Sequence, residues 1–372
     1  DADFQRYLYR RIVAQLDQLG LKTGVGIALD PQTGAILALV NIPSFDTRVF
    51  IDRKRNEERI ALLRDEHEPL FNRGVSGLYS PGSVMKPLLA LAALHEGVVT
   101  PDAEVFSSGL LEIPNPYYPE ESSRFLDWRA HGWVDARAAL AASSNVYFYA
   151  AGGGVPYPAI LERRGAFDSN GVGIKRLNGY WRMFGFGAET GIDLDAEGIG
   201  FLPDPREKEI RTGTPWRLGD TYNVSIGQGD LLVTPFQLLN FIASIGMSGR
   251  MYRPYLFAER PSMLLRDYAK EFQAEIPVVQ QGLRDAVEKP YGTAYSLSDL
   301  PMSVAGKTGS AQVRGNTRVN AFFAGYAPVD TPQIALLILI ENAREGSLNA
   351  LPVAEDALRW YYEKRLSRGG AR

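Results

Sequence analysis

Two groups of strand-like segments, one near each end of the chain, constrain the fold more than any other feature. Near the start, residues 25–29 and 35–40 are apolar and flank a turn at 30–34 that contains Pro and Gly, which predicts a β-hairpin. Near the end, three more runs have the character of strands: 303–313, 320–326 and 333–341. Strands joined by hairpins run antiparallel, and helices cover the apolar faces of such a sheet. We therefore expect one antiparallel five-stranded sheet, built from both ends of the chain and flanked by helices.

The remaining segments predict helices and surface loops. Residues 3–19 are amphipathic, and Gly20 is expected to end this helix. Its apolar stripe consists of Phe4, Leu8, Ile12, Leu16 and Leu19. A final helix is expected from Pro352 to Leu366, and the charged segment 46–70 reads as a surface excursion.

Between about 100 and 260, short helical patterns alternate with loops rich in Gly and Pro. Together, these patterns predict an α/β (α+β) fold. A sheet lobe would comprise about 1–45 and 295–372, and a mostly helical lobe would comprise about 80–290.

The composition argues against several classes of protein. The 372 residues include no cysteine, which removes disulfides, thiolate nucleophiles and cysteine metal ligands. A formal net charge of −3 gives no reason to expect nucleic-acid binding. The three histidines, His67, His95 and His131, form no metal-type pair. Because the sequence also lacks a Gly-x-Ser-x-Gly elbow, an ordinary Ser-His-Asp hydrolase is not expected.

Ser83 and Lys86 lie three residues apart where a helix is expected to begin. Pro87 suits the first turn of a helix because it has no amide hydrogen to donate. A helix from Ser83 to about Glu96 would place both side chains on one face, with the hydroxyl near the positive end of the helix dipole. A neutral lysine beside it could take the hydroxyl proton. Alone, the pair is weak evidence, because roughly one Ser-x-x-Lys match is expected by chance in a chain of this length.

Two further motifs strengthen the pattern. Ser143-Ser144-Asn145 supplies a hydroxyl and an amide at the boundary of two apolar segments, although such residues also commonly cap helices. Lys307-Thr308-Gly309-Ser310 lies in a strand-like run, and Lys-Thr-Gly is expected by chance in only about one such chain in ten. Its cation and hydroxyls suit a substrate carboxylate. Gly309 within a strand often marks the close approach of another backbone.

The three motifs occur in the order that is typical of penicillin-binding proteins and related β-lactamases. The chain resembles that superfamily over nearly its whole length, with further matching segments at 30–46, 184–194, 225–237 and 323–328. Three other segments make it most similar to the class B, elongation-type enzyme (penicillin-binding protein 2): Asn72-Arg73-Gly74, Asp127-Trp128-Arg129 and Trp216 with the residues that follow it.

The resemblance implies a serine D,D-transpeptidase that cross-links peptidoglycan stem peptides in cell-wall elongation and cell-shape maintenance. Ser83 would attack the carbonyl between the two terminal D-alanines and form an acyl-enzyme, which an amine of a neighbouring stem would then resolve. Lys86 would be the base for Ser83. Ser143 would relay protons, and Asn145 would orient Lys86 and the substrate amide.

The third motif would bind the end of the substrate. By resemblance, Lys307 would supply positive charge, while Thr308, Gly309 and Ser310 would bind the substrate and its terminal carboxylate. The backbone amides of Ser83 and Ser310 would form the oxyanion hole. A free lysine has a pKa of about 10.4, so Lys86 must be kept neutral by burial or by a nearby charge. We expect Lys307 to be the main cause.

The sequence departs from the family at the second and third motifs. Asn145 stands where the elongation type often has Asp, and Ser310 stands where Thr is usual. Some elongation-type relatives carry a zinc near the second motif, and Asp127 and His131 lie in the corresponding region. A cysteine ligand would be missing there, with Ser144 in its place, so no metal and no other cofactor is expected.

The resemblance also bears on partners and location. It implies binding of peptidoglycan stem peptides and β-lactam antibiotics, and a membrane glycosyltransferase of the elongation machinery as a partner. The chain reads as a catalytic domain without the family's N-terminal membrane anchor and pedestal domain, from a protein of the inner membrane whose catalytic domain faces the periplasm. Two alternatives stay open: a β-lactamase or β-lactam sensor on the same fold, and a catalytically silent cell-wall scaffold.

Overall fold

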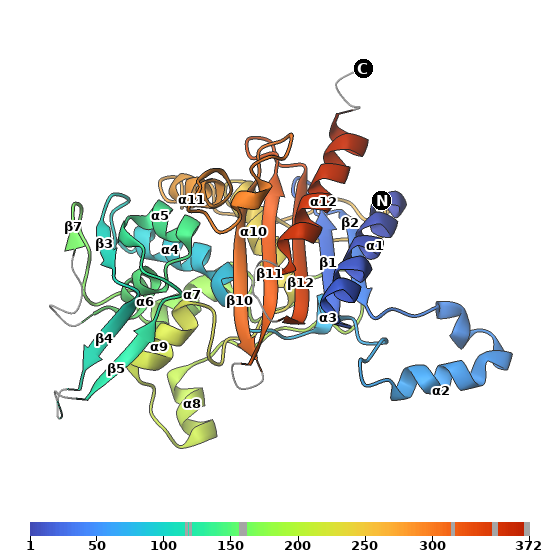
Figure 1. Cartoon of the computed structure of the whole chain (residues 1–372), viewed down its shortest axis with the longest axis horizontal. Coiled ribbons are helices and arrows are strands. Elements are labelled where there is room, and N and C mark those ends of the chain that lie inside the picture. The colour runs from blue at the N-terminus through green and yellow to red at the C-terminus, as the bar shows by residue number, and fades with distance from the viewer. Residues whose placement is uncertain (116–117, 119–120, 156–161, 314–316, 344–348, 368–372) are drawn as a thin grey trace.

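The five predicted strands form one antiparallel sheet in the computed structural model (Figure 1). The structure describes residues 1–115, 118, 121–155, 162–313, 317–343 and 349–367. The sheet order is β10-β11-β12-β1-β2, so the C-terminal strands lie beside the N-terminal hairpin. The strands are β1 Gly24–Leu29, β2 Ile36–Ile42, β10 Ala305–Val313, β11 Arg318–Ala327 and β12 Ile334–Ala343. The predicted fold class is therefore confirmed.

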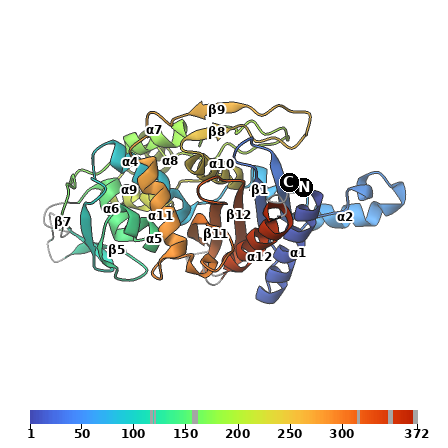
Figure 2. The same ribbon diagram turned by 90° about the horizontal axis from the view of Figure 1, so that it is seen from above.

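Alternate residues of the central strand β12 enter two different cores. Ile338 and Ile340 belong to the core under α1 (Ala2–Leu19) and α12 (Leu351–Tyr361). Leu337 and Leu339 belong to the larger core on the other face, which includes α4 (Lys86–His95) and α10 (Pro235–Gly246). Figure 2 shows α1 and α12 side by side on one face and α10 on the other. Because both faces are covered, β12 is apolar at successive positions rather than at every second one.

The N-terminal helix forms as the sequence predicts, with one correction. Phe4, Leu8, Ile12 and Leu16 are buried along one stripe, but Leu19 is 36% exposed. Leu19 is the last residue of α1, next to the left-handed Gly20 that ends the helix, so the buried stripe stops one turn earlier. Phe4 stacks on Trp360 of α12 with ring centroids 5.3 Å apart, which ties α1 to α12.

The middle of the chain contains short helices, as expected, and also strands that the sequence pattern does not predict. The additional strands are β3 Glu104–Ser107, β4 Leu110–Pro114, β5 Ser122–Leu126, β6 Gly132–Val134, β7 Glu162–Arg163, β8 Arg250–Tyr252 and β9 Leu264–Asp267. They form one small sheet of order β6-β3-β7 and the hairpins β4-β5 and β8-β9. Most positions of β4 and β5 are exposed or half-buried, which explains why they lack a strong apolar pattern.

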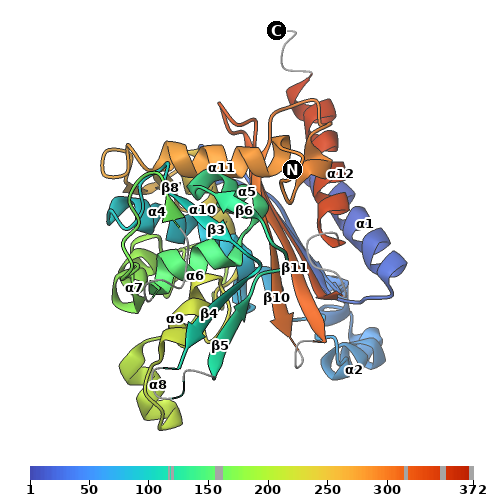
Figure 3. The same ribbon diagram turned by 60° about the vertical axis from the view of Figure 1, so that its left-hand side comes forward.

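The helices of this middle part lie on the side of the large sheet where β10 forms its edge (Figure 3). They are α5 Ala136–Ala142, α6 Asn145–Gly153, α7 Ile174–Met183, α8 Pro205–Thr212, α9 Leu218–Ser225 and α11 Ile276–Glu288, of which α11 packs against β10. The 3-10 turn η3 (Gly82–Met85) packs against β10 and continues into α4. Two further short turns are η2 Arg53–Arg55 and η4 Tyr295–Leu297, and a π-helical turn, Tyr362–Leu366, follows α12.

The charged segment 46–70 is a surface excursion, as predicted. It holds the turn η1 (Thr47–Phe50) and the helix α2 (Asn56–Arg64), and Figure 1 shows it projecting away from the sheet. The short helix α3 (Arg73–Ser76) returns the chain to the core, where Arg73 is 4% exposed. Among the described residues, no helix combines the length and the apolar character needed to cross a bilayer.

The substitution Phe4→Ala should strongly destabilise the protein, because it removes a fully buried ring that packs on Trp360 and Tyr361. We expect the free energy of unfolding to fall by about 3–5 kcal/mol, measured by chemical denaturation. Tyr9→Ala on the exposed face of the same helix is the control and should cost about 0.5 kcal/mol or less. Equal losses in the two variants would contradict the packing described for α1.

Candidate active site

A cavity of about 500 Å³ lies where η3, the junction of α5 and α6, and β10 meet. Six of the eight predicted site residues line it: Ser83, Ser143, Asn145, Thr308, Gly309 and Ser310. The other two, Lys86 and Lys307, are fully buried and do not contribute to its surface. Three motifs that are far apart in the sequence therefore converge on one cavity.

Ser83 lies in the 3-10 turn η3, and the α-helix α4 begins at Lys86, three residues later than predicted. Side chains at i and i+3 eclipse one another in a 3-10 turn, so Ser83 and Lys86 still share one face. Pro87 occupies the first turn of α4, as expected. Within the described residues, however, the Lys86 amine hydrogen-bonds to the α5–α6 junction and not to the Ser83 hydroxyl.

Three acceptors from the second motif hold the Lys86 amine. Its Nζ donates to the carbonyl oxygen of Ser143 at 2.8 Å, to Ser143 Oγ at 3.3 Å and to Asn145 Oδ1 at 2.7 Å. Burial lowers the pKa of Lys86 to about 7, although the negative charge of Asp127 opposes this shift. A substantial fraction of the Lys86 amines is therefore neutral near pH 7 and able to accept a proton.

Lys307 is not the main cause of the low pKa of Lys86, so this expectation is wrong. Burial has the largest effect because it removes water from the charged amine. The same effect places the pKa of Lys307 well below its usual range, and the charge of Lys86 lowers it further. The Lys307 amine donates to the carbonyl oxygen of Thr308 at 3.0 Å.

The second motif occupies the break between two helices. Helix α5 ends at Ala142, and Ser143 adopts a left-handed conformation with φ 58°. Ser144 then caps α6, and its Oγ accepts a hydrogen bond from the amide of Tyr147 at 3.3 Å. Asn145 is the first residue of α6, and its Nδ2 donates to the carbonyl oxygen of Leu126 at 3.2 Å. The second motif therefore caps α6 and also places Ser143 and Asn145 at the cavity.

The third motif lies on β10, at the edge of the large sheet. Thr308 Oγ1 donates to Thr293 Oγ1 at 2.7 Å, and Ser310 is exposed to the cavity. A Cβ atom on Gly309 would lie 2.7 Å from Val84 Cγ2 and 3.2 Å from the carbonyl oxygen of Pro81. The backbone of η3 thus comes close to β10 at Gly309, as the glycine in the strand predicts.

Two more glycines allow backbone segments to meet beside the Ser83 turn. The amide of Gly82 donates to the carbonyl oxygen of Gly227 at 2.9 Å. A Cβ on Gly227, where φ is 74°, would lie 2.0 Å from the carbonyl oxygen of Gly82. A Cβ on Gly82 would lie 2.8 Å from the carbonyl oxygen of Ser310. No side chain fits at either position. Because both residues are glycine, the Ser83 turn can contact Gly227 on one side and β10 on the other.

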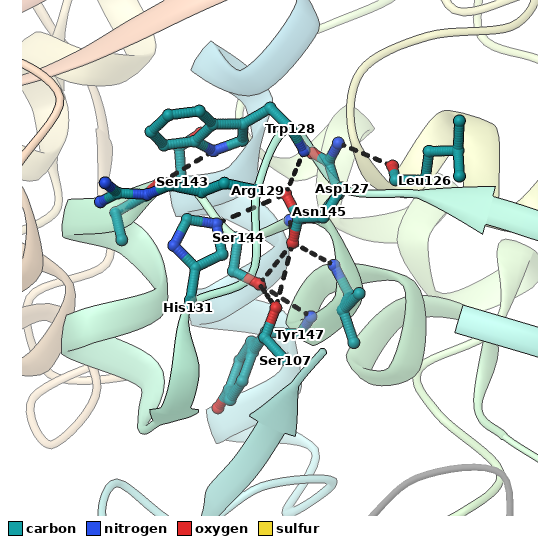
Figure 4. Close-up of polar contacts among 12 residues, drawn as sticks. Ser107, Leu126, Asp127, Trp128, Arg129, His131, Ser143, Ser144, Asn145 and Tyr147 are labelled. Atoms are coloured by element: carbon teal, nitrogen blue, oxygen red, sulfur yellow. Dashed lines mark hydrogen bonds and ion pairs between the residues drawn. The ribbon is translucent and has the colours of Figure 1, made fainter. Parts of the chain in front are cut away.

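A polar cluster lies at the start of α6 (Figure 4). Asp127 Oδ2 lies within hydrogen-bond distance of the hydroxyls of Ser107 and Ser144 and of the amides of Asn145 and Val146. Asp127 Oδ1 lies 3.5 Å from Nε2 of the buried His131. Although burial raises the pKa of Asp127, the polar contact with His131, the hydrogen bonds from these amides and the charge of Lys86 hold it well below its usual range.

These residues do not fit a zinc site. Structural zinc needs four ligands, chosen mainly from Cys, His and carboxylates. In the described part of the chain, no third residue of these types joins Asp127 and His131. Ser107 and Ser144 complete the cluster instead, and their hydroxyls lie 3.0 Å from each other.

Several residues of the cavity were not predicted as site residues. Thr293, the partner of Thr308, follows α11 in an ordinary Gly-Thr-Ala segment that carries no distinctive signal. Trp128 also lines the cavity, and its indole Nε1 donates to the carbonyl oxygen of Ala142 at 3.2 Å. The remaining lining residues are Ile226, Gln228, Gln312 and Val319. Only the resemblance to a family drew attention to the segments that contain Trp128 and Gln228.

Comparisons of the sequence and of the structure with known proteins point to the same family. Residues 24–359 match the family described as the penicillin binding protein transpeptidase domain. The peptidoglycan D,D-transpeptidase MrdA of Haemophilus influenzae is 32% identical over 392 aligned residues, which cover 98% of this chain and 56% of that protein. The chain thus spans about half the length of the curated relatives it matches.

Solved structures agree with this match. The complex between penicillin-binding protein 2 and MreC from Helicobacter pylori has a TM-score of 0.82 and 27% identity, covering 97% of this chain and 63% of the matched one. A structure described as the structural coordination of polymerization and crosslinking by a peptidoglycan synthase complex has a TM-score of 0.78 and 30% identity, covering 98% of this chain and 61% of the matched one.

The substitution Gly227→Ala should destabilise the protein more than an alanine at another left-handed glycine. Gly213 has φ 68°, and a Cβ added there would have no atom within 4 Å, so Gly213→Ala tests the backbone strain alone, which costs about 1–2 kcal/mol. Gly227→Ala adds the clash with Gly82, and we expect a further loss of at least about 1 kcal/mol, measured by chemical denaturation. If Gly213→Ala were equally destabilising, the close packing of Gly227 on Gly82 would be refuted.

Proposed function

The chain belongs to the penicillin-binding protein transpeptidase family, and we propose that it is a serine D,D-transpeptidase that cross-links peptidoglycan stem peptides through an acyl-enzyme on Ser83. One observation carries this proposal: the Lys86 amine is fully buried, has a pKa near 7, and belongs to the residue that directly follows η3, the turn whose Ser83 opens onto the cavity. That arrangement supplies a nucleophile together with a base that is partly neutral at the pH of the reaction.

The proposed reaction has two acyl transfers. Ser83 Oγ forms a bond to the carbonyl carbon between the two terminal D-alanines, and its proton passes to Lys86. The carbon–nitrogen bond breaks, and the departing D-alanine takes the proton from Lys86 through Ser143. An amine of a second stem peptide then attacks the ester carbonyl and gives a proton to the base. The bond to Ser83 breaks as the cross-link forms, and Ser83 recovers its proton.

The contacts of Lys86 support the roles proposed for the second motif. Ser143 Oγ lies 3.3 Å from the amine and also faces the cavity, so it can carry a proton between Lys86 and the leaving group. Asn145 Oδ1 accepts from the amine at 2.7 Å and orients it. Asn145 also lines the cavity, where it would contact the substrate amide.

The third motif is proposed to bind the terminal carboxylate of the donor stem. Thr308, Gly309 and Ser310 line the cavity, and the buried Lys307 lies on the same strand. Thr293 Oγ1 lies 2.7 Å from Thr308 Oγ1 and would fix the direction of that hydroxyl. The amides of Ser83 and Ser310 would form the oxyanion hole, an assignment supported by the packing of Gly82 against Ser310.

We further propose a role in cell-wall elongation and cell shape, on the extracytoplasmic side of the inner membrane. Support comes from MrdA, which is named a peptidoglycan D,D-transpeptidase, and from the structure that describes a peptidoglycan synthase complex. A membrane glycosyltransferase is therefore the proposed partner. The site would lie between a sheet lobe, about 1–45 and 295–372, and a helical lobe, about 80–290.

Incubation with a β-lactam should add the mass of one β-lactam to the chain, detected by intact-mass spectrometry, because the opened ring remains as an ester on Ser83. The adduct should persist for many minutes. Ser83→Ala should abolish it, whereas Ser80→Ala, three residues earlier in the same segment, should not.

The other outcomes distinguish the competing functions. Rapid release of the opened β-lactam from the wild-type chain would indicate a β-lactamase instead. Labelling that survives in Ser83→Ala would refute Ser83 as the nucleophile. A wild-type chain that never forms an adduct would point to a catalytically silent scaffold.

The rate of acylation by the β-lactam should rise with pH and reach half of its plateau near pH 7. Below the pKa of Lys86, about 7, the amine is protonated and cannot take the proton of Ser83, so the rate should fall about tenfold for each further pH unit. Stopped-flow measurement between pH 5 and 9 tests this. Lys289→Met, at an exposed lysine, should leave the profile unchanged, and a flat wild-type profile would exclude Lys86 as the base.

A further inference from the structure

One carboxylate organises the start of helix α6. The side chain of Asp127 is completely buried, and four donors lie within hydrogen-bond distance of its Oδ2 (Figure 4). They are Ser107 Oγ at 3.2 Å, Ser144 Oγ at 2.9 Å, the amide of Asn145 at 2.7 Å and the amide of Val146 at 3.0 Å. The two amides belong to the first turn of α6, whose backbone donors would otherwise have no partner. A negative charge at this end of the helix is also favoured by the helix dipole.

The two residues next to Asp127, Leu126 and Trp128, also form hydrogen bonds with the α5–α6 junction. The carbonyl oxygen of Leu126 accepts from the side-chain amide of Asn145 at 3.2 Å. Trp128 Nε1 donates to the carbonyl oxygen of Ala142, the last residue of α5. Segment 126–128 therefore contacts the α5–α6 junction both before and after Ser143. The side chains that touch Lys86 have little freedom to move while these bonds are in place.

We propose that Asp127 is a positioning residue whose carboxylate holds the first turn of α6 and thereby places Ser143 and Asn145 against the Lys86 amine. This inference rests on the proposed function, because it assigns Asp127 to the same acylation reaction. Asp127 does not contact the cavity itself, so it acts through Asn145 and Ser143.

Hydrogen bonds from serine hydroxyls link the described residues of this cluster. The Ser144 hydroxyl lies 3.0 Å from Ser107 Oγ and 2.9 Å from Asp127 Oδ2, and its oxygen accepts from the amide of Tyr147. Two serine hydroxyls, which are not the ligands that zinc prefers, thus lie beside Asp127. We therefore expect the position of α6 to be independent of any bound metal.

The charge of Asp127 should also affect the pKa of Lys86. The charged or titratable groups around the two residues are Lys307 on β10, His131, and Tyr149 of α6, whose pKa is raised by burial and by the charge of Asp127. The negative charge of Asp127 favours the protonated form of Lys86. Removing that charge should lower the pKa of Lys86, so the neutral base would persist to a lower pH.

The test is the pH profile of β-lactam acylation in Asp127→Asn. The variant keeps the shape of the side chain but loses its charge and half of its acceptors. We expect the plateau rate to fall at least about tenfold, because Asn145 and Ser143 are misplaced, and the half-plateau pH to move to a lower value. A loss of folded protein alone would lower the amount of adduct without moving the half-plateau pH.

Asp135→Asn is the matched control. Asp135 is the N-cap of the neighbouring helix α5 and accepts from the amide of Ala138 at 2.8 Å, so it is another carboxylate that binds first-turn amides of a helix. Asn caps a helix about as well as Asp, so Asp135→Asn removes one carboxylate charge while the plateau rate and the half-plateau pH should stay at the wild-type values.

The outcomes separate this inference from the proposed function. If wild-type protein forms no adduct, the proposed function fails. If wild-type reacts and Asp127→Asn keeps both the plateau and the half-plateau pH, the positioning role is refuted while the function stands. Should Asp127→Asn not fold, Ser144→Ala removes one donor to Asp127, and an unchanged plateau in that variant would refute the role. Stoichiometric zinc in the purified protein, with slower acylation after EDTA, would show a metal site instead of this hydrogen-bonded cluster.

Discussion

The active-site cavity depends on backbone segments that touch without intervening side chains. Gly82 lies between Gly227 on one side and Ser310 of β10 on the other, and Gly309 faces the turn that carries Ser83. A methyl group at any of these glycines would overlap a neighbouring atom. This close packing sets the distance between the turn that carries Ser83, the proposed nucleophile, and the strand proposed to bind the substrate carboxylate. Backbone packing therefore fixes the relative positions of the segments that carry the proposed catalytic groups.

Burial of two lysines is the second requirement of the site. An amine without water around it loses most of the solvation that stabilises its charge, so both Lys86 and Lys307 are driven toward the neutral form. Among the described residues, Lys86 has three acceptors and the nearby charge of Asp127, whereas the Lys307 amine has the carbonyl oxygen of Thr308. A buried lysine lowers stability in most protein cores. Here Lys86 is buried with a pKa of about 7, close to neutral pH.

The sequence was sufficient to predict the large sheet, because its strands are apolar runs bounded by turns, and to predict close packing at Gly309. The three motifs also identified six of the residues that line the cavity. The sequence did not reveal that the α-helix begins at Lys86, since a 3-10 turn and an α-helix require the same residue types over four positions. Thr293 and the strands β4 and β5 were missed because their contacts lie on partly exposed surfaces, where no apolar period develops. Burial, rather than the charge of Lys307, has the largest effect on the pKa of Lys86. Burial depends on how the core packs around the amine, so the motif alone could not reveal it.

The sheet order has a consequence for how the chain acquires its structure. β1 forms hydrogen bonds with β12, and Gly24 pairs with Ile340, so neighbours in the centre of the sheet come from nearly opposite ends of the chain. Pairings of such high sequence separation form slowly, because a long loop must close before any contact is gained. During synthesis on a ribosome, the first hairpin must wait until β12 has emerged before β1 gains its second neighbour. Until then its apolar edge has no partner, which makes this interval the one in which the polypeptide is most exposed to aggregation.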